Sequence, residues 1–311
     1  MLSQILTLGG SALELGLISS LTVLSLFLSY SMLNVCDLST DGCFTLGAAV
    51  GAVVALSGNW YLAIPAAMLA GVASGLITAL LQTYLGVDSL LSGIIVNTAL
   101  YSVNIAIMGN SSLLNLNRTT TVFSAVKDFL AQSFLAPYYK IIVIGLAVFV
   151  VAALLCLFLR TRLGLAIRAT GNNPAMVKSS SVNPAFTTIV GLMISGSVTA
   201  LSGCLMAQYQ KSVNIDIGTG MVTVALASLL IGNAFFKKGN IPLRAFGAVV
   251  GAFIFRLVYT VALRLQMPAY MLKLVSSVIV VIAISGPYIK QKWPLLYKKL
   301  KSKEVRGQIN A

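Results

Sequence analysis

A series of long apolar runs constrains this chain more than any other feature of its sequence. A helix needs about 20 consecutive apolar residues to cross a membrane, within a range of roughly 17–25. Such runs recur along the whole sequence, at residues 12–33, 43–57, 61–84, 89–109, 140–159, 186–207, 220–236, 243–263 and 270–289. The second and seventh runs are short and glycine-rich, which is typical of broken or re-entrant helices. The sequence therefore predicts one all-α domain over residues 1–311, a polytopic membrane protein with about nine transmembrane helices.

The composition excludes a soluble protein. Of the 311 residues, 58% are hydrophobic and 9% are charged, whereas a soluble domain carries about 25% charged residues. The net charge of +14 could indicate nucleic-acid binding, but the basic residues lie in loops between apolar runs. We therefore expect no nucleic-acid partner. Seven basic residues fall within 290–311 and predict a cytoplasmic tail that faces anionic membrane lipid.

The basic residues also predict which loops face the cytoplasm, because lysine and arginine are enriched on that side. With the tail inside, segments 160–185 and 237–242 fall inside and segment 110–139 falls outside. When each basic residue is assigned to its nearer face, 14 lie inside and seven outside. Nine spans then place the N-terminus outside. Segment 110–139 is the longest polar stretch and could contain a short surface helix.

The two halves of the chain resemble each other. The run Asp37-Leu-Ser-Thr matches Asp216-Ile-Gly-Thr, and two further matches follow in the same order at offsets of 176–180 residues. Five spans separate the first pair, and an odd number gives the halves opposite orientations. The sequence thus predicts two inverted repeats, about 34–109 and 213–289, with a substrate path between them. Pairs of glycines four residues apart predict close helix packing; they are Gly47/Gly51, Gly71/Gly75 and Gly247/Gly251.

Several polar side chains within or beside the apolar runs are candidates for a translocation path. They are Asn34, Asp37, Asn97, Asn104, Asp216, Asn233 and Arg256. Asn97 and Asn104 are one heptad apart and share a helix face, where pore lining and hydrogen bonding between helices are equally good explanations. Arg256 is the one charge deep within a span. Snorkelling toward the outer surface explains it better than a contact with a substrate carboxylate.

The sequence holds no catalytic or metal-binding constellation. There is no histidine, no carboxylate pair within a span, and no metal-ligand spacing among the four cysteines. We therefore expect no metal, no cofactor and no enzymatic activity. The phosphate-binding motif GxxxxGK[ST] is absent, so a separate subunit would have to hydrolyse ATP. The acidic residues lie near span ends or in loops, which argues against the alternative, an ion-coupled secondary carrier or channel.

The loop over residues 160–184 carries four basic residues and no acidic one. Asn173 followed by Pro174 is typical of a helix start, with asparagine as the N-cap and proline at the first helical position. Pro184 ends the element before the next span. We expect a helix of about two turns, with Lys178 on it, that could transmit a partner's movement to the spans. An ordinary cytoplasmic loop would explain the same spacing.

This loop resembles the cytoplasmic loop of the permease family that serves binding-protein-dependent ABC importers of branched-chain amino acids, ribose and related sugars, and nucleosides. The resemblance rests on Thr161, Arg162, Gly164, Ala166, Arg168, Ala169, Gly171, Asn173, Pro174 and Ala175. The run that begins Asp37-Leu-Ser and the residues 225–251 are also similar to this family. Within it, the chain looks most like the tryptophan/tyrosine-type subgroup.

The resemblance implies a transport subunit of the bacterial cell membrane. Two permease copies, a homodimer in this interpretation, would form the pore. Cytoplasmic ATPase subunits would hold the loop, and an extracytoplasmic solute-binding protein would deliver the solute. The implied coupling residues are Arg162, Gly164, Arg168, Gly171, Asn173, Pro174, Ala175 and Lys178. The implied solute is small and polar, an amino acid and in this subgroup an aromatic one; a sugar or a nucleoside is the alternative.

Overall fold

Long apolar helices make up most of the chain. The computed structural model describes residues 2–117, 119–129, 138–236, 240–264, 271, 274, 277–281 and 285, and leaves out the side chains of 2–8, 263 and 264. Six helical segments in these ranges are long and apolar enough to cross a membrane. They are α1 (Leu2–Leu26) with the π-helical η1 (Phe27–Met32), α3 (Ala63–Thr83), α4 (Ser89–Ile107), α6 (Tyr139–Phe158), α9 (Pro184–Gln210) and α11 (Ile241–Arg264). The all-α polytopic membrane architecture is thus confirmed.

Two further apolar helices are shorter than the hydrocarbon core of a membrane. α2 (Thr40–Leu56) has 17 residues and α10 (Met221–Phe236) has 16, so each is about 25 Å long, shorter than a hydrocarbon core of about 30 Å. The segments before them, 33–39 and 211–220, contain no helix. The second and seventh runs thus each hold a short helix that follows a non-helical segment, the arrangement of a broken or re-entrant helix; we call α2 and α10 the broken helices below. Of the nine expected spans, the ninth lies largely outside the described residues, and the basic tail lies wholly outside them.

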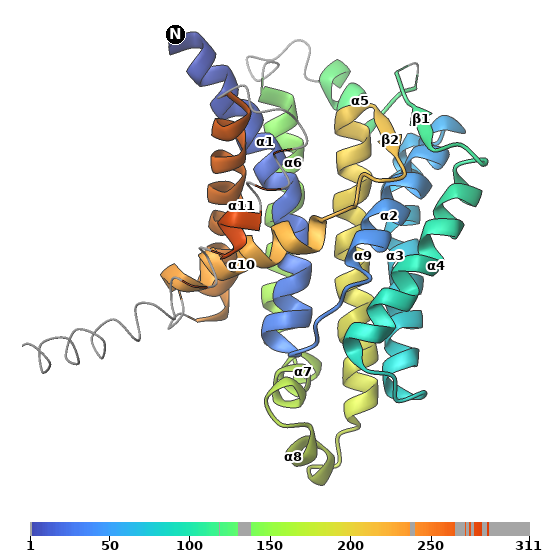
Figure 1. Ribbon diagram of the computed structural model, residues 1–311, viewed down its shortest axis with the longest axis vertical. Coiled ribbons are helices and arrows are strands. Elements are labelled where there is room, and N and C mark those ends of the chain that lie inside the picture. Colours follow the sequence, from blue (N-terminus) through green and yellow to red (C-terminus); the bar gives the residue numbers. More distant parts are fainter. Residues whose placement is uncertain are drawn as a thin grey trace, which may run out of the picture.

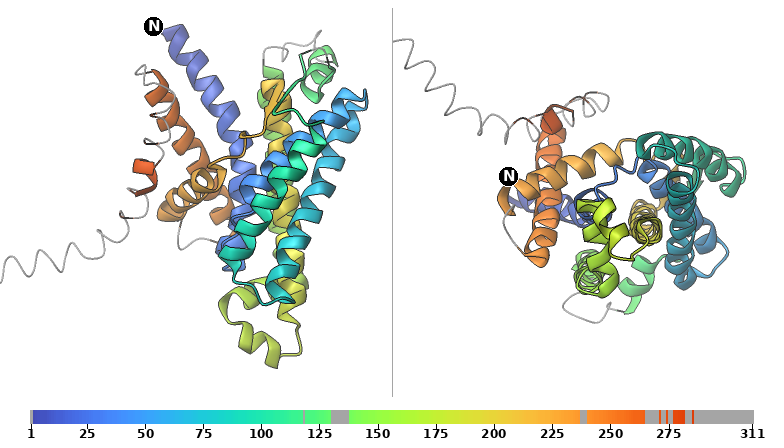
Figure 2. Two further views of the ribbon diagram at one scale, coloured as in Figure 1. Left: turned by 45° about the vertical axis from the view of Figure 1, so that its right-hand side comes forward. Right: turned by 90° about the horizontal axis from the view of Figure 1, so that it is seen from below.

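The helices form two groups (Figure 1). α2, α3, α4 and α9 lie together, and α1, α6, α10 and α11 form the other group. α1 also packs against α9 and so joins the two groups. Most helices follow the long axis of the molecule, whereas α10 lies across it at mid-height (Figure 2). This arrangement brings the start of α10 to the start of α2, in the middle of the bundle.

The two ends of the bundle carry different elements. A short surface helix, α5 (Val122–Phe129), lies at the end where the chain begins, together with an antiparallel pair, β1 (Leu113–Asn115) and β2 (Ser212–Asn214). Two other short helices, α7 (Arg162–Asn172) and α8 (Pro174–Ser179), lie at the opposite end (Figure 1). The described parts of segment 110–139 and the loop 160–184 are therefore at opposite ends, as the distribution of basic residues predicts.

Small residues let the helices within each group approach closely. A Cβ atom on Gly71 of α3 would collide with the carbonyl oxygen of Gly196 in α9. In the other group, a Cβ atom on Gly251 of α11 would collide with the carbonyl oxygen of Ser228 in α10. The packing role predicted for the spaced glycine pairs is therefore confirmed.

A seam of hydroxyl groups joins α1 to α9. Thr22 Oγ1 donates to Ser202 Oγ over 2.9 Å, and Ser202 Oγ donates to the carbonyl oxygen of Ile18 over 2.7 Å. Closer to the other end, the hydroxyl oxygens of Ser25 and Thr199 lie 2.6 Å apart. All of these groups are buried, and buried polar groups are costly unless they are hydrogen-bonded. The seam therefore favours one register for the helix pair that links the two groups.

The order of elements is similar in the two halves. α1, a non-helical segment, α2 and α3 recur as α9, a non-helical segment, α10 and α11. In the first half α4 follows, and its counterpart would fall on residues 270–289, most of which lie outside the described part of the chain. The inverted repeat therefore stays a prediction.

Candidate translocation path and coupling helices

The carboxylate of Asp41 ties the two short helices together. Asp41 lies in the first turn of α2, and its Oδ2 accepts a hydrogen bond from the backbone N–H of Gly220 over 2.9 Å. Its Oδ1 accepts one from the N–H of Val222 over 2.8 Å. Both donors are at the start of α10, where backbone N–H groups lack partners within the helix. A side chain from one broken helix thus caps the other.

A polar cavity of 240 Å³ lies beside this joint, between α2, α4 and the segment that precedes α10. Among its lining side chains are three of the predicted path residues, Asn97, Asn104 and Asp216. The cavity is also lined by Asp41, one of the acidic residues near span ends, which is not among the predicted path residues. Its position 179 residues before Gly220, the same offset that separates Asp37 from Asp216, was the signal that could have revealed it.

Asn104 is the most deeply buried of these side chains, with 1% of its surface exposed. Its Nδ2 donates to the carbonyl oxygen of Gly42 over 3.2 Å. Its Oδ1 is buried and accepts no hydrogen bond from any described residue. Asn97 approaches the same glycine, because a Cβ atom on Gly42 would lie 2.7 Å from Asn97 Oδ1. The two asparagines thus share one face of α4, and they combine contact between helices with cavity lining.

Asp37 and Asn34 occupy the non-helical segment before α2 and do not line the cavity. Asp37 is buried, and its Oδ1 accepts hydrogen bonds from the N–H of Ser39 over 2.9 Å and from its hydroxyl over 2.6 Å. These bonds fold the chain into a turn that leads into α2. Asn34 is exposed at φ 57°, in the left-handed region that asparagine tolerates better than most residues. Both positions shape the chain before the helix.

Asn233 and Arg256 also lie away from the cavity lining. Asn233 is a half-buried residue of α10. Arg256 lies where α11 packs against α1: a Cβ atom on Gly16 would be 3.6 Å from Arg256 Cβ, and the guanidinium carbon is 5.4 Å from the ring centre of Tyr259. The cation–π contact lies within α11 itself, and it is the close approach to Gly16 that places Arg256 in the interface with α1.

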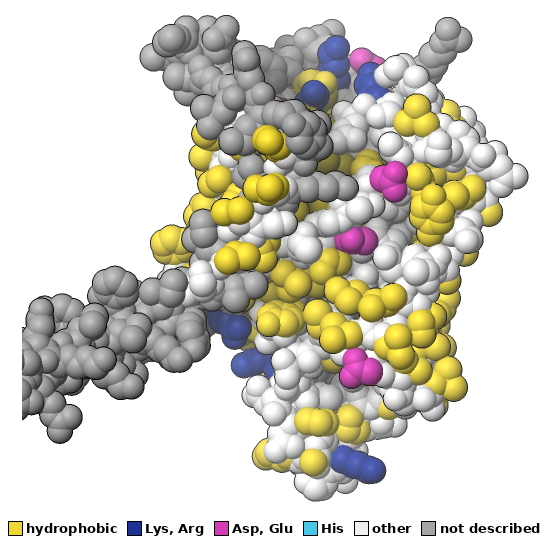
Figure 3. Space-filling model, in the orientation of Figure 1, with side chains coloured by type: hydrophobic (Ala, Val, Ile, Leu, Met, Phe, Trp, Pro, Cys, Tyr) yellow, Lys and Arg dark blue, Asp and Glu magenta, His cyan; other side chains and the backbone are white. Residues whose placement is uncertain are grey.

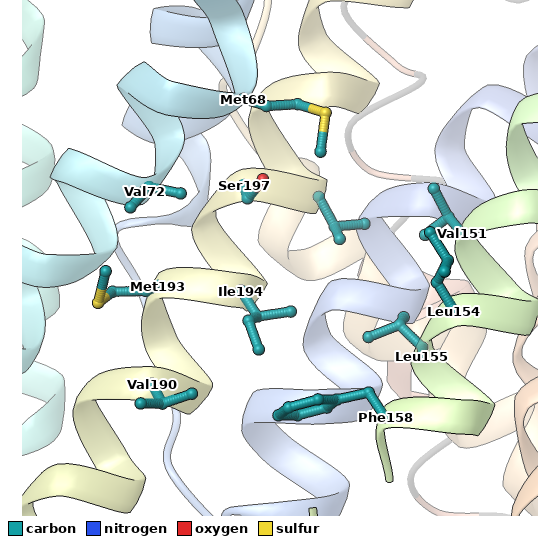
Figure 4. A pocket seen from close by; sticks show the side chains of 11 residues that line it. Met68, Val72, Val151, Leu154, Leu155, Phe158, Val190, Met193, Ile194 and Ser197 are labelled. Atoms are coloured by element: carbon teal, nitrogen blue, oxygen red, sulfur yellow. The ribbon is translucent and has the colours of Figure 1, made fainter. Parts of the chain in front are cut away.

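A second cavity, of 470 Å³, is apolar and lies between α3, α6 and α9. Figure 4 shows Met68 and Val72 from α3, and Leu155 and Phe158 from α6, arranged around the same space. Ser197 supplies the one hydroxyl among the lining residues. A polar solute would lose hydrogen bonds to water there without replacing them. This cavity is therefore a poor route for a polar solute.

Both short helices in the loop 160–184 begin at side-chain caps. Thr161 Oγ1 accepts from the N–H of Gly164 at the start of α7. Asn173 Oδ1 accepts from the N–H groups of Ala175 and Met176, each over 3.1 Å, and Pro174 is the first residue of α8. The helix start predicted at Asn173-Pro174 is confirmed. α7 was not expected, because its single buried stripe is too short to stand out in a basic loop.

α7 is docked firmly on the helix ends above it. A Cβ atom on Gly171 would collide with the carbonyl oxygen of Met32, at the end of η1. A Cβ atom on Gly164 would collide with the carbonyl oxygen of Phe158, at the end of α6. The hydroxyl oxygen of Thr170 lies 2.8 Å from that of Thr187 in α9. α7 thus contacts three long helices at once. One of them, α1 with η1, leads directly into the non-helical segment 33–39 before α2.

The surface of this pair of helices combines basic and apolar side chains (Figure 3). Arg162 and Lys178 are exposed, and Arg168 is half-buried. Large apolar side chains are also exposed, with Met176 of α8 at 67% and Phe186, in the first turn of α9, at 52%. Of the predicted coupling residues, Gly164 and Gly171 therefore form the docked side. The exposed side is formed by Arg162, Asn173, Pro174, Ala175 and Lys178.

Comparisons with known proteins agree with this architecture. The family model for the branched-chain amino acid transport system permease component matches residues 10–284. The chain is 35% identical to the tyrosine transport system permease protein of Clostridioides difficile over 273 residues, which cover 87% of this chain and 88% of that protein.

Permeases with other named solutes are also similar. The chain is 29% identical to the D-allose transport system permease protein of Escherichia coli over 235 residues, which cover 68% of this chain and 71% of that protein. The match to the autoinducer 2 import system permease protein of Escherichia coli is shorter, 27% over 125 residues, covering 40% and 36% of the two chains. No solved structure matches significantly.

Proposed function

We propose that this chain, which belongs to the branched-chain amino acid transport permease family, translocates an amino acid, and an aromatic one in particular. The chain is the membrane-spanning transport subunit of an ABC importer, so ATP hydrolysis belongs to another subunit. We assign the coupling to that ATPase to α7 and α8. The observation that carries this assignment is the docking of α7 on η1, α6 and α9, with α8 exposed beyond it.

The contacts of α7 offer a continuous route for movement. Gly171 lies against Met32 without room for a side chain, so a displacement of α7 would press on the end of η1. η1 continues into the segment 33–39 and then into α2. Asp41 in α2 holds the start of α10 through two hydrogen bonds. An ATPase that moves α7 and α8 would therefore act on α2, which lines the polar cavity, and on α10, which follows the lining segment.

The opposite end of the bundle is the proposed docking side for a solute-binding protein. α5 and the β1–β2 pair lie there, and β2 leads directly into the segment that lines the polar cavity. We propose that a receptor releases the solute near this ribbon. A second copy of the permease would complete the path.

An amino acid is the proposed solute because the similarity to the tyrosine permease is higher and covers more of the chain than the similarity to the D-allose permease. The polar cavity agrees with a small solute that carries both donors and acceptors. A sugar would use the same hydroxyl and amide partners. Uptake must therefore be measured with both classes of solute.

The proposal is tested by purifying the protein from its own membrane and identifying what accompanies it. We expect an ATPase subunit to co-purify. Reconstituted vesicles with the complete complex and its receptor should then accumulate tyrosine in an ATP-dependent manner, and D-allose should not compete. Uptake by the permease alone, without ATP, would establish the alternative of a secondary carrier or channel. Competition by the sugar alone would exclude the amino acid.

A further inference from the structure

The polar cavity is rich in hydrogen-bond acceptors and carries negative charge. Asp41 and Asp216 supply two carboxylates, and no lysine or arginine is among the lining residues. The charge of Asp41 is partly balanced by two N–H groups of α10 and by the positive end of that helix. The carboxylate of Asp216 is exposed and has no partner among the described residues. The cavity therefore has a negative charge, on Asp216, that no described residue neutralises.

An independent feature of the same cavity is the unpaired oxygen of Asn104. This side chain is 1% exposed and lines the cavity, and its Nδ2 donates a hydrogen bond to the carbonyl oxygen of Gly42. Its Oδ1 has no donor among the described residues. A buried polar atom without a partner is uncommon and costs free energy. An acceptor in this state favours a ligand that brings a hydrogen-bond donor.

We propose that this cavity binds the protonated amine of the solute. Asp216 attracts the ammonium group, and Asn104 Oδ1 accepts one of its hydrogen bonds. Tyr101, which is half exposed at 51% and lines the same cavity, offers an aromatic face next to the amine. This assignment rests on the proposed function, because it presumes an amino acid, and it names the part of the solute that the permease recognises.

The charge of the cavity can be measured without any transport partner. Thr98 is exposed and lines the cavity, so Thr98→Cys in a full-length protein whose four native cysteines are replaced by alanine provides a reporter thiol. Reaction rates are compared for a cationic trimethylammonium and an anionic sulfonate methanethiosulfonate, each relative to free cysteine. We expect the cation to be favoured about tenfold. Asp216→Asn should remove most of this preference. Equal rates for both reagents would overturn the proposal.

The amine itself is tested by protection of the same thiol. Tyrosine and tyramine both carry an amine, whereas 3-(4-hydroxyphenyl)propanoate keeps the ring and the carboxylate but lacks it. We expect the two amines to slow labelling of Thr98→Cys several-fold and the propanoate to have no effect. Asn104→Leu should abolish protection by the amines while the charge preference persists. Ser111→Cys, which lies outside the cavity lining, should be unprotected throughout.

The outcomes separate this inference from the proposed function. Labelling and protection require neither ATP nor a receptor. Protection by the propanoate, or none by the amines, overturns the amine site even if the complex imports amino acids. Protection by the amines supports the site even if no ATPase co-purifies. If Asn104→Leu does not fold, the exposed Asp216→Asn still tests the attraction of the amine.

Discussion

Replacement of Asp41 tests the joint between the two broken helices. Its two carboxylate oxygens accept from Gly220 and Val222 over 2.9 and 2.8 Å. A hydrogen bond to a charged group contributes about 1.5–3 kcal/mol, so two of them amount to roughly 3–6 kcal/mol. Asp41 is half-buried and lines a cavity that water can enter. We therefore expect Asp41→Ala to lower the free energy of unfolding by about 3 kcal/mol, at the lower end of that range.

Two variants make this expectation specific. Asp41→Asn keeps one acceptor oxygen but turns an amide nitrogen toward the second N–H group, so it should cost about half as much as Asp41→Ala. Asp88→Ala is the matched control, because Asp88 caps α4 through one bond, to the N–H of Leu90 over 2.9 Å. Loss of such a single cap costs about 1 kcal/mol.

The assay is titration of the detergent-solubilised protein with SDS, followed by circular dichroism. The expected order of destabilisation is Asp41→Ala, then Asp41→Asn, then Asp88→Ala. ATP-driven uptake should fall for both Asp41 variants and stay unchanged for Asp88→Ala, because Asp41 joins α2 to α10 whereas Asp88 caps α4. If Asp41→Ala is no less stable than Asp88→Ala, the carboxylate does not hold the joint and the reasoning is refuted.

Three further predictions concern other parts of the chain. Gly171→Val should abolish ATP-driven uptake while membrane insertion persists, because the valine side chain would push α7 away from Met32. The control Gly145→Val, at a position with open space around it, should leave uptake unchanged. Uptake by the Gly171→Val variant would contradict the coupling route. Charge reversal by Lys178→Glu should weaken the binding of the ATPase subunit about two- to fivefold, as expected for one exposed charge, and this difference in affinity should shrink in high salt. Tighter binding of the variant would exclude a contact between Lys178 and acidic groups of the ATPase. Ser25→Ala should lower the free energy of unfolding by about 0.6 kcal/mol, as for an average hydrogen bond between membrane helices. Ser57→Ala removes an exposed hydroxyl that bonds only to α2 and should have no measurable effect. Equal losses of unfolding free energy in the two variants would show that the seam between α1 and α9 does not stabilise the fold.

Much of the fold could be predicted because it depends on local sequence. The hydropathy of each run indicates a span whatever surrounds it, and the helix start at Asn173-Pro174 follows from the chemistry of two neighbouring residues. The shortness of α2 and α10 was visible in the length of their apolar runs. The docked helix α7 was not visible. Its buried side consists of Gly164, Ile167 and Thr170. Of these only Ile167 is a large apolar residue, so no apolar stripe marks a helix within the basic loop.

The candidate site could be predicted only in part. Polarity within or beside an apolar run singled out Asn97, Asn104 and Asp216, and these three do line one cavity. The same criterion selected Asp37, which accepts hydrogen bonds in a turn, and Arg256, which lies in the interface between α11 and α1. Asp41 was missed because a carboxylate near a helix start has an ordinary local explanation. Its contact with α10, across 179 residues of sequence, has no local sign.

The sequence by itself determined that this chain is an all-α membrane protein, where its long helices lie, and that its basic loop and its longest polar stretch occupy opposite ends. These properties follow from the transfer of single segments out of water, to which each residue contributes independently of the fold. Only the tertiary structure decided which polar groups meet. The joint at Asp41, the unpaired oxygen of Asn104 and the contact of Gly171 with Met32 each depend on two distant segments packed side by side, and hydrogen bonds and close contacts act over only a few ångströms.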